Sequence, residues 1–211
     1  MRRRLYESAM SLFAERGYDE TSVDDIAEKA DVARATVFNY FKRKDDFLDE
    51  WTSGRQESLS ATIIEQRSLH ADTRAQLHHC LIVLAAVNED DVSTARTLVS
   101  AWVRSGRPVT EEPYTAYIFA DIITHGIANG DIRSDVDAGL IGNILRDMYL
   151  GTLYRWIDGE NHPPFSLSSH LLASLEVLLQ GIEKSGVNLR RLVVNPMTHG
   201  AAGGRLNFTP V

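Results

Sequence analysis

The side chains best suited to recognition chemistry lie between Val32 and Lys44. This stretch has no acidic residue and four basic ones: Arg34, Lys42, Arg43 and Lys44. Polar side chains lie among them: Thr36, Asn39 and Tyr40. Arginine and lysine pair with phosphate oxygens, and amide and hydroxyl groups hydrogen-bond to the edges of bases. The segment therefore has the chemistry of a nucleic-acid contact.

Two short helices joined by a three-residue turn are expected to position these groups. Ser22 is placed to cap the first helix, and Asp25 completes a capping-box pattern three residues later. Its apolar face is formed by residues at helical spacing: Val23, Ile26, Ala27 and Ala30. The turn falls at residues 31–33, and the second helix, from about 34 to 41, buries Val37 and Phe41. Such a helix, flanked by positive charge, suits the major groove of DNA.

The remainder of the chain is acidic. It has 211 residues, a net charge of −7 and a pI of about 5.5, so any DNA contact must be local and depend strongly on salt. The lone cysteine, Cys80, excludes an internal disulfide framework and favours a reducing cytoplasm. The sequence has neither a signal-peptide pattern nor an uninterrupted apolar run of membrane-spanning length. We therefore expect a cytoplasmic protein without a membrane contact.

Helical periodicity dominates the whole chain, and strand signals are nearly absent. A first helix with apolar Leu5, Ala9, Leu12 and Phe13 is expected to end at Gly17. A longer helix should begin after Lys44 and continue toward residue 66. Further helices are expected at residues 77–87, 92–104, 114–129, 137–158 and 166–184. The sequence thus predicts an all-α protein of about nine helices.

The N-terminal fifty residues resemble the tetracycline-repressor (TetR) family of bacterial transcriptional regulators. The resemblance is carried by four spaced strings in fixed order: AMSLFAERGY at 9–18, TSVDDIA at 21–27, RATVFNYF at 34–41 and KDDFL at 44–48. The remaining two-thirds agrees only in layout. The resemblance implies a three-helix DNA-binding domain followed by a helical domain for ligand binding and dimerisation. The boundaries we expect are 1–48, 49–186 and a tail at 187–211.

The resemblance also implies roles for individual residues. Thr36 and Asn39 lie where the family's recognition helix meets base edges or nearby phosphates. Tyr40 and Lys44 lie where it grips the phosphate backbone, and Ser22 lies where a helix start meets a phosphate. With the basic Arg34, these residues form the predicted DNA contact.

Two positions depart from the family pattern. The turn carries Asp31 where glycine is usual, and Asp tolerates a left-handed backbone better than most residues. Ala33 replaces the usual serine cap, which should cost the recognition helix roughly 1 kcal/mol.

Aromatic residues on the middle helices indicate either plain core or the walls of an effector pocket. The candidate lining residues are Trp102, Tyr114, Tyr117, His125 and Tyr149, with Phe119 in the same region. Arg104 and Asn129 are further candidates for its polar groups. The sequence does not decide between the two interpretations for any one residue.

The last two long helices, Asp137–Asp158 and Ser166–Lys184, carry more apolar surface than one compact domain needs. Pairing with the same helices of a second subunit would bury that surface in a four-helix bundle, and Gly142 and Gly151 would permit a close approach. The alternative is a monomeric helical core. A two-fold dimer also suits a palindromic DNA site.

A cluster of histidines at 70, 78 and 79, with Cys80 beside them, raises the possibility of a metal or redox site. Adjacent histidines on a helix point about 100° apart, so they do not share one ion easily. Cys80 fits a small core residue better. We expect no cofactor and no metal.

These observations favour a ligand-responsive repressor that binds a palindromic operator as a dimer. An activator on the same scaffold remains open, because repression depends on where the operator lies. The other alternative is a helical enzyme or small-molecule carrier without a DNA function. The sequence has no nucleophile elbow, phosphate loop or zinc-protease motif to support catalysis.

Overall fold

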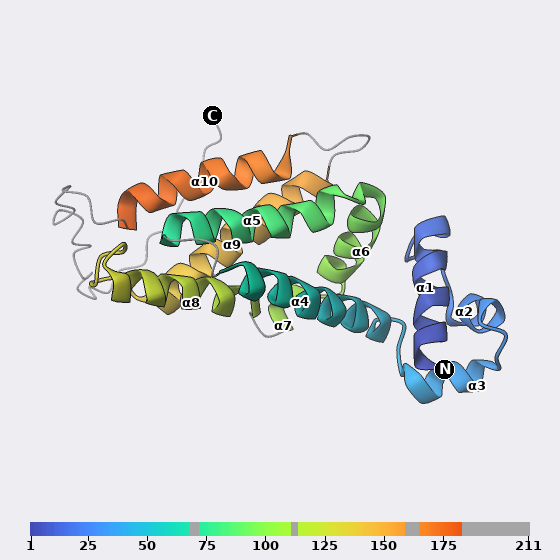
Figure 1. Ribbon diagram of the computed structural model, residues 1–211. Helices are drawn as coiled ribbons and strands as arrows, with labels where there is room; N and C mark the ends of the chain where they lie inside the picture. The colour runs from blue at the N-terminus through green and yellow to red at the C-terminus, as the bar shows by residue number, and fades with distance from the viewer. Residues whose placement is uncertain (68–71, 111–113, 159–164, 183–211) are drawn as a thin grey trace, which may run out of the picture.

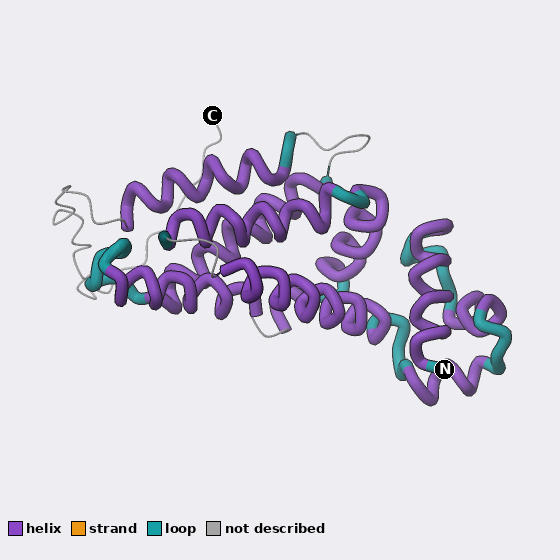
Figure 2. Tube along the Cα trace, viewed as in Figure 1, coloured by secondary structure: helices purple, strands orange, loops and turns teal. Residues whose placement is uncertain are grey.

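A computed structural model describes residues 1–67, 72–110, 114–158 and 165–182 (Figures 1 and 2). These residues form helices without any strand. The helices are α1 (Arg2–Arg16), α2 (Val23–Lys29), α3 (Arg34–Tyr40), α4 (Asp46–Arg67), α5 (Thr73–Glu89), α6 (Val92–Arg104), α7 (Arg107–Thr110), α8 (Tyr114–Asn129), α9 (Ala138–Ile157) and α10 (Leu167–Ile182). The all-α prediction is confirmed.

The short α7 is the one described helix that the sequence does not predict. It is a single turn of four residues, and without it the described helices number nine. Pro108 suggests a break, but a proline is tolerated in the first turn of a helix because the amides there have no intrahelical acceptor.

Helices α1, α2 and α3 form a small N-terminal unit around an apolar core (Figure 1). Leu5, Ala9, Leu12 and Phe13 of α1 are all buried there, as their spacing predicts. The start of α4 completes this core: the Phe47 ring stacks on Phe41 with 3.9 Å between centroids. Helix α6 also contributes to it, through the buried Leu98 and Ala101.

Helix α4 is continuous from the N-terminal unit into the larger helical body (Figures 1 and 2). Its first turn contains Asp46 and Asp49, where acidic side chains stabilise the positive end of the helix dipole. Phe47 and Leu48 belong to the N-terminal core, while Trp51 contacts both cores. The expected domain boundary at residue 48 therefore falls inside a helix that both parts share.

The larger body packs α5, α8, α9 and α10 around a second core. Gly142 of α9 is buried against α8, where an added Cβ would lie 2.5 Å from the backbone oxygen of Ala116. Gly142 therefore permits a close helix approach, as expected, and the helix that approaches it is α8 of the same chain. Gly151 is half-buried, and a Cβ added there would lie nearest to the flexible end of the Arg155 side chain.

Both ends of α9 and the start of α10 agree closely with prediction. Asp137 caps α9, accepting a hydrogen bond from the Leu140 amide at 2.7 Å, and Asp158 follows its last residue. The final two residues of the predicted helix 166–184, and the predicted tail at 187–211, lie outside the described residues. No helix within the described ranges has the length and apolar character to cross a bilayer.

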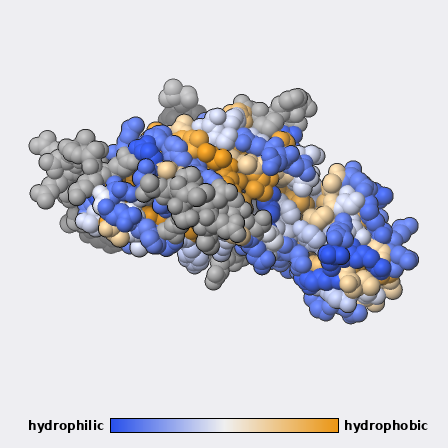
Figure 3. Space-filling model, viewed as in Figure 1, coloured by the Kyte–Doolittle hydropathy of each residue, from blue (hydrophilic) through white to orange (hydrophobic). Residues whose placement is uncertain are grey.

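Large apolar side chains remain exposed on the last two helices. Val177 of α10 is 72% exposed, and Leu140 and Ile144 of α9 are 58% and 39% exposed. In Figure 3 apolar surface gathers over α5 and α10, whereas hydrophilic surface predominates on the N-terminal unit. Apolar side chains are therefore exposed on both α9 and α10.

Candidate DNA interface and effector pocket

The start of α2 is fixed by a reciprocal capping box. The Ser22 hydroxyl accepts a hydrogen bond from the Asp25 amide at 3.1 Å, and the Asp25 carboxylate accepts one from the Ser22 amide at 2.7 Å. The serine hydroxyl also donates to that carboxylate, and these bonds lower the pKa of Asp25. The capping box predicted from the sequence is therefore confirmed, and Ser22 is exposed at the end of the helix.

The turn between α2 and α3 has the backbone that the sequence indicates. Asp31 adopts a positive φ of 50°, and the Val32 amide donates to the Ala27 carbonyl at 3.0 Å. Ala33 stands at the N-cap of α3 without a side-chain hydrogen bond. The recognition helix thus begins with its first amides unoccupied by a capping side chain.

Helix α3 divides its side chains between the core and the surface. Val37 is fully buried and Phe41 is 1% exposed, as predicted. Asn39 and Tyr40 are exposed, Tyr40 by 41%, and Thr36 is half-buried. The polar and aromatic groups proposed for DNA contact are therefore accessible on one short helix.

Both basic residues among the predicted DNA contacts are engaged within the protein, as Ser22 is through its capping box. Arg34 forms an ion pair with Asp24 of α2 and lies 5.3 Å from the centroid of the Phe38 ring. The Lys44 ammonium donates to the carbonyls of Tyr18 and Thr21, at 2.9 and 3.1 Å. Lys44 therefore ties the α3–α4 connection to the loop after α1, a role that the sequence does not indicate.

The carboxyl end of α3 is also held from α1. Arg2 donates to the Tyr40 carbonyl at 2.8 Å, and its guanidinium lies 4.3 Å from the centroid of the Phe41 ring. The same guanidinium pairs with Glu50 of α4. Arg2 thus connects the end of the recognition helix with the helix that leads into the larger body.

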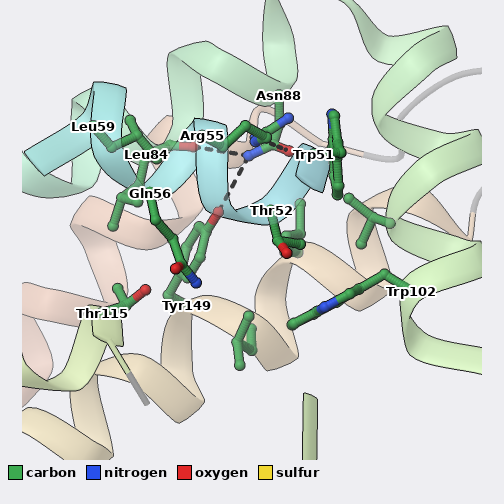
Figure 4. Close-up of a pocket in the computed structure, with 13 residues that line it drawn as sticks. Trp51, Thr52, Arg55, Gln56, Leu59, Leu84, Asn88, Trp102, Thr115 and Tyr149 are labelled. Carbon is green, nitrogen blue, oxygen red and sulfur yellow. Dashed lines mark hydrogen bonds between the residues drawn. The ribbon is translucent and has the colours of Figure 1, made fainter. Parts of the chain in front are cut away.

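A cavity of about 90 Å³ lies in the larger body, beside the N-terminal half of α4 (Figure 4). Helices α4, α5, α6, α8 and α9 all contribute to it. The lining residues are Trp51, Thr52, Arg55, Gln56, Leu59, Leu84, Asn88, Val99, Trp102, Thr115, Tyr149, Leu150 and Leu153. Its walls are mainly apolar and aromatic, with a few polar groups, as in most small-molecule sites.

Arg55 is the one charged side chain among the lining residues. Its guanidinium donates to the Asn88 side-chain oxygen at 2.9 Å and lies 4.7 Å from the centroid of the Trp51 ring. The Asn88 amide nitrogen donates in turn to the Leu84 carbonyl at 2.8 Å and to the Tyr149 hydroxyl at 3.2 Å. Figure 4 shows Arg55, Asn88 and Tyr149 meeting at one side of the cavity. Burial lowers the pKa of Arg55 and raises that of Tyr149.

The structure brings together only part of the predicted pocket set. Trp102 and Tyr149 line the cavity. The Tyr114 hydroxyl instead meets Ser60, Tyr117 is 55% exposed, and His125 is exposed with a ring nitrogen 2.7 Å from the Asp121 carbonyl.

The other residues considered for the pocket also lie elsewhere. Arg104 pairs with Asp19 at 2.7 Å, Asn129 is exposed, and Phe119 is in the core.

Sequence reasoning missed the contribution of α4 to this cavity. Trp51, Arg55 and Leu59 recur four residues apart, which places them on one helical face. An arginine in that otherwise apolar and aromatic stripe is the signal that identifies this wall.

The histidine and cysteine candidates have structural roles where they are described. A His78 ring nitrogen lies 2.6 Å from the Glu176 carboxylate, which also pairs with Arg74. Cys80 is fully buried, and burial raises the pKa of its thiol to about 12. His70 lies outside the described residues. Within the described ranges, no group of three or more histidine, cysteine or acidic side chains is arranged to hold a metal ion.

The known proteins that this chain resembles are bacterial transcriptional regulators. Residues 5–51, from α1 to the start of α4, match the family described as bacterial regulatory proteins, tetR family. Over 195 residues the chain is 26% identical to the HTH-type transcriptional repressor KstR2 of Mycobacterium tuberculosis, covering 87% of this chain and 93% of that protein. It is 24% identical over 184 residues to the fatty acid metabolism regulator protein of Bacillus subtilis, covering 84% and 93%.

A solved structure resembles the chain over nearly its whole length. It is Thermus thermophilus FadR, described as a TetR-family transcriptional repressor in complex with lauroyl-CoA. The TM-score is 0.72 at 25% identity, and the match covers 95% of this chain and 100% of FadR.

Proposed function

Because the chain belongs to the tetR family of bacterial regulatory proteins, we propose that it represses transcription by binding an operator and leaves it when a small molecule binds. The observation that carries the DNA function is the accessible face of α3, which lies beside the capped start of α2 within the segment that the family matches. An enzyme is not favoured, since the similar proteins are transcriptional regulators.

For the DNA contact we propose that Thr36 and Asn39 read bases while Tyr40 holds a phosphate. Support comes from the exposure of Asn39 and Tyr40 and from the partial exposure of Thr36. Ser22 would bring the amino end of α2 to a second phosphate. Arg34 and Lys44 would add positive charge while keeping α3 in place on its neighbours.

Family members generally act as dimers, and we propose that α9 and α10 form the interface here. Exposed Leu140, Ile144 and Val177 support this choice, because a four-helix bundle with a second copy would bury them. A two-fold dimer presents two copies of α3 to two half-sites of a palindrome.

For the response to ligand we propose that the cavity beside α4 holds the effector. Five of its lining residues are on α4: Trp51, Thr52, Arg55, Gln56 and Leu59. Phe47 and Leu48, one turn earlier, are in the N-terminal core. A ligand that displaces α4 would therefore alter the spacing of the two recognition helices, and a bias of a few kcal/mol is enough to release DNA.

The effector is proposed to have an apolar body, because leucine, valine and tryptophan side chains form most of the wall. The lauroyl-CoA of the similar FadR is a compound of this kind. The cavity is smaller than most drug-sized sites, so a long chain would require the helices to move apart.

The test is selection of bound fragments from a genomic or random DNA pool with the purified protein, followed by a screen for compounds that release them. We expect a palindromic fragment to be enriched and retained at moderate salt. Failure to enrich any sequence, or binding that stays non-specific at moderate salt, would contradict the proposal. The position of the fragment relative to its promoter separates repression from activation.

A further inference from the structure

The cavity beside α4 contains a positive charge that no acidic group in its wall neutralises. Arg55 is the only charged side chain among the lining residues, and the other α4 residues in the wall are neutral. Across the parts of the chain that the structure describes, no carboxylate forms an ion pair with this guanidinium; its hydrogen bond goes to the neutral amide of Asn88. A half-buried charge without a counter-ion is costly, because water no longer solvates it fully.

The orientation of Arg55 is fixed by a chain of hydrogen bonds. Asn88 is fully buried, and its amide nitrogen donates hydrogen bonds to the Leu84 carbonyl and the Tyr149 hydroxyl. Its oxygen must therefore face Arg55, which donates to it through one terminal nitrogen. Trp51 packs against the guanidinium at 4.7 Å. The arginine is thus held in place before any ligand arrives.

A guanidinium has five N–H donors in one plane, and a single one is used here within the described structure. The free edge matches two oxygens of a carboxylate or phosphate, which arginine binds in pairs. The neighbouring wall is apolar, with Leu59, Val99 and Leu153 among its members. A ligand that suits both features carries an anionic oxygen group at one end and an apolar body at the other.

We propose that the effector is an organic anion whose charged oxygens pair with Arg55 while its apolar part fills the rest of the cavity. The inference rests on the proposed function, since it assigns the ligand class of the same site. Two sources supply this chemistry: a free carboxylate, or the phosphates in the coenzyme A part of an acyl-CoA. A purely structural Arg55, which only supports Asn88 and Trp51, gives no preference for anions.

The test compares matched acids and neutral compounds by isothermal titration calorimetry on the full chain. The probes are benzoate against benzamide, octanoate against octan-1-ol, and octanoyl-CoA as the thioester arm. We expect at least one anion to bind about tenfold or more tightly than its neutral partner, as charge-assisted hydrogen bonds provide. Octanoate ahead of octanoyl-CoA identifies a carboxylate ligand. The reverse order, if it is lost in Arg55→Met, identifies the phosphates of the coenzyme A part.

Variants of the arginine and its support decide whether the preference comes from Arg55. Arg55→Met should abolish the preference, and Arg55→Lys should keep part of it, because a lysine retains the charge without the planar fork. Asn88→Asp preserves shape but supplies an internal anion to Arg55, so it should also abolish the preference. Arg104→Met, which removes an exposed guanidinium outside the cavity, should leave the preference intact.

Circular dichroism and melting temperature establish that each variant is folded. The inference is overturned if no anionic probe binds, if the neutral partners bind equally well, or if folded Arg55→Met and Asn88→Asp both retain the preference. Its failure is separate from that of the proposed function. If the wild-type protein binds an operator and a neutral compound with no anionic rival releases it, the proposed repressor function stands. The proposal of an anionic effector then fails.

Discussion

Arg2 and Glu50 form an ion pair that joins the first residue of α1 to the first turns of α4. The guanidinium Nε and Nη2 atoms donate to one carboxylate oxygen at 3.0 and 2.5 Å. Since Arg2 also donates to the Tyr40 carbonyl, the pair connects the end of α3 to α4, the helix that lines the cavity. Glu50 is adjacent in sequence to the cavity residue Trp51.

Replacing Arg2 with methionine is expected to weaken operator binding several-fold without changing its salt dependence. The arginine is engaged by Glu50 and Tyr40, so its loss should loosen α3 rather than remove a phosphate contact. A mobility-shift titration at several salt concentrations measures both quantities. Arg3→Met is the matched control, because the Arg3 side chain is 90% exposed and its ion pair within the described residues is with Glu7 of its own helix. A flatter salt slope for Arg2→Met would mean that Arg2 contacts phosphate instead.

Ser22→Ala should destabilise α2 and raise the pKa of Asp25. The variant removes the hydroxyl that caps the Asp25 amide and donates to its carboxylate, but it leaves the backbone bond from residue 22. Loss of such a cap costs about 1 kcal/mol. Because the folded-state pKa of Asp25 is lowered, its stabilisation is present above the ordinary carboxyl pKa and lost as the pH falls below it. Carbon-13 NMR titration and urea unfolding follow the two effects. An unchanged Asp25 pKa would contradict the role of the hydroxyl.

Asn39→Ala and Tyr40→Phe should affect operator binding in different ways. Asn39 is expected to read a base. Its removal should therefore lower the discrimination against wrong bases at one operator position by about 1–3 kcal/mol. Tyr40→Phe removes a hydroxyl proposed to meet a phosphate, and it should weaken binding to all sequences similarly. Selection of bound DNA followed by sequencing separates the two patterns. If neither variant alters binding, the exposed face of α3 is not the contact surface.

Gly142→Ala should destabilise the protein by about 2 kcal/mol or more, because the added methyl group meets backbone rather than a movable side chain. Gly54→Ala is the control: its methyl group would meet nothing within 4 Å, and replacing a glycine inside α4 should stabilise by about 0.5–1 kcal/mol. Chemical unfolding of both variants measures the difference. Equal stabilities would show that α8 and α9 are able to separate without cost.

Glu176→Gln should lower the melting temperature at neutral pH by a small amount. The pairs with Arg74 and His78 lower the pKa of the Glu176 carboxyl from its ordinary 4.5. Their stabilisation is therefore complete above that value and disappears as the pH falls through the lowered pKa. Melting curves at neutral and acidic pH should show the wild type and variant converging in acid. A difference that persists in acid would point to packing rather than charge.

The features predicted well from sequence are those that a few neighbouring residues determine. Ser22 and Asp25 are one helical turn apart, and the positive φ of Asp31 belongs to a single residue, so local chemistry is sufficient for both. The burial of Val37 and Phe41 follows from their spacing on α3.

The cavity was harder to predict because its wall combines distant helices. Helix α8 carries apolar residues on most of its sides, so periodicity does not reveal that Tyr117 faces solvent while Phe119 is buried. The contacts among Arg55, Asn88 and Tyr149 join three helices far apart in sequence. The contacts of Lys44 were hard to predict for the same reason, because its carbonyl partners come from the loop after α1, far away in sequence.

Leu98 and Ala101 of α6 complete the core of the N-terminal unit. In evolutionary terms the DNA-reading part is therefore not a freely transferable module. A chimera that joins residues 1–48 to the body of another regulator would need a compatible α6 surface, or it would leave this core beside mismatched neighbours. Exchange of operator specificity between relatives should then succeed more often by substituting the face of α3 than by recombining whole domains.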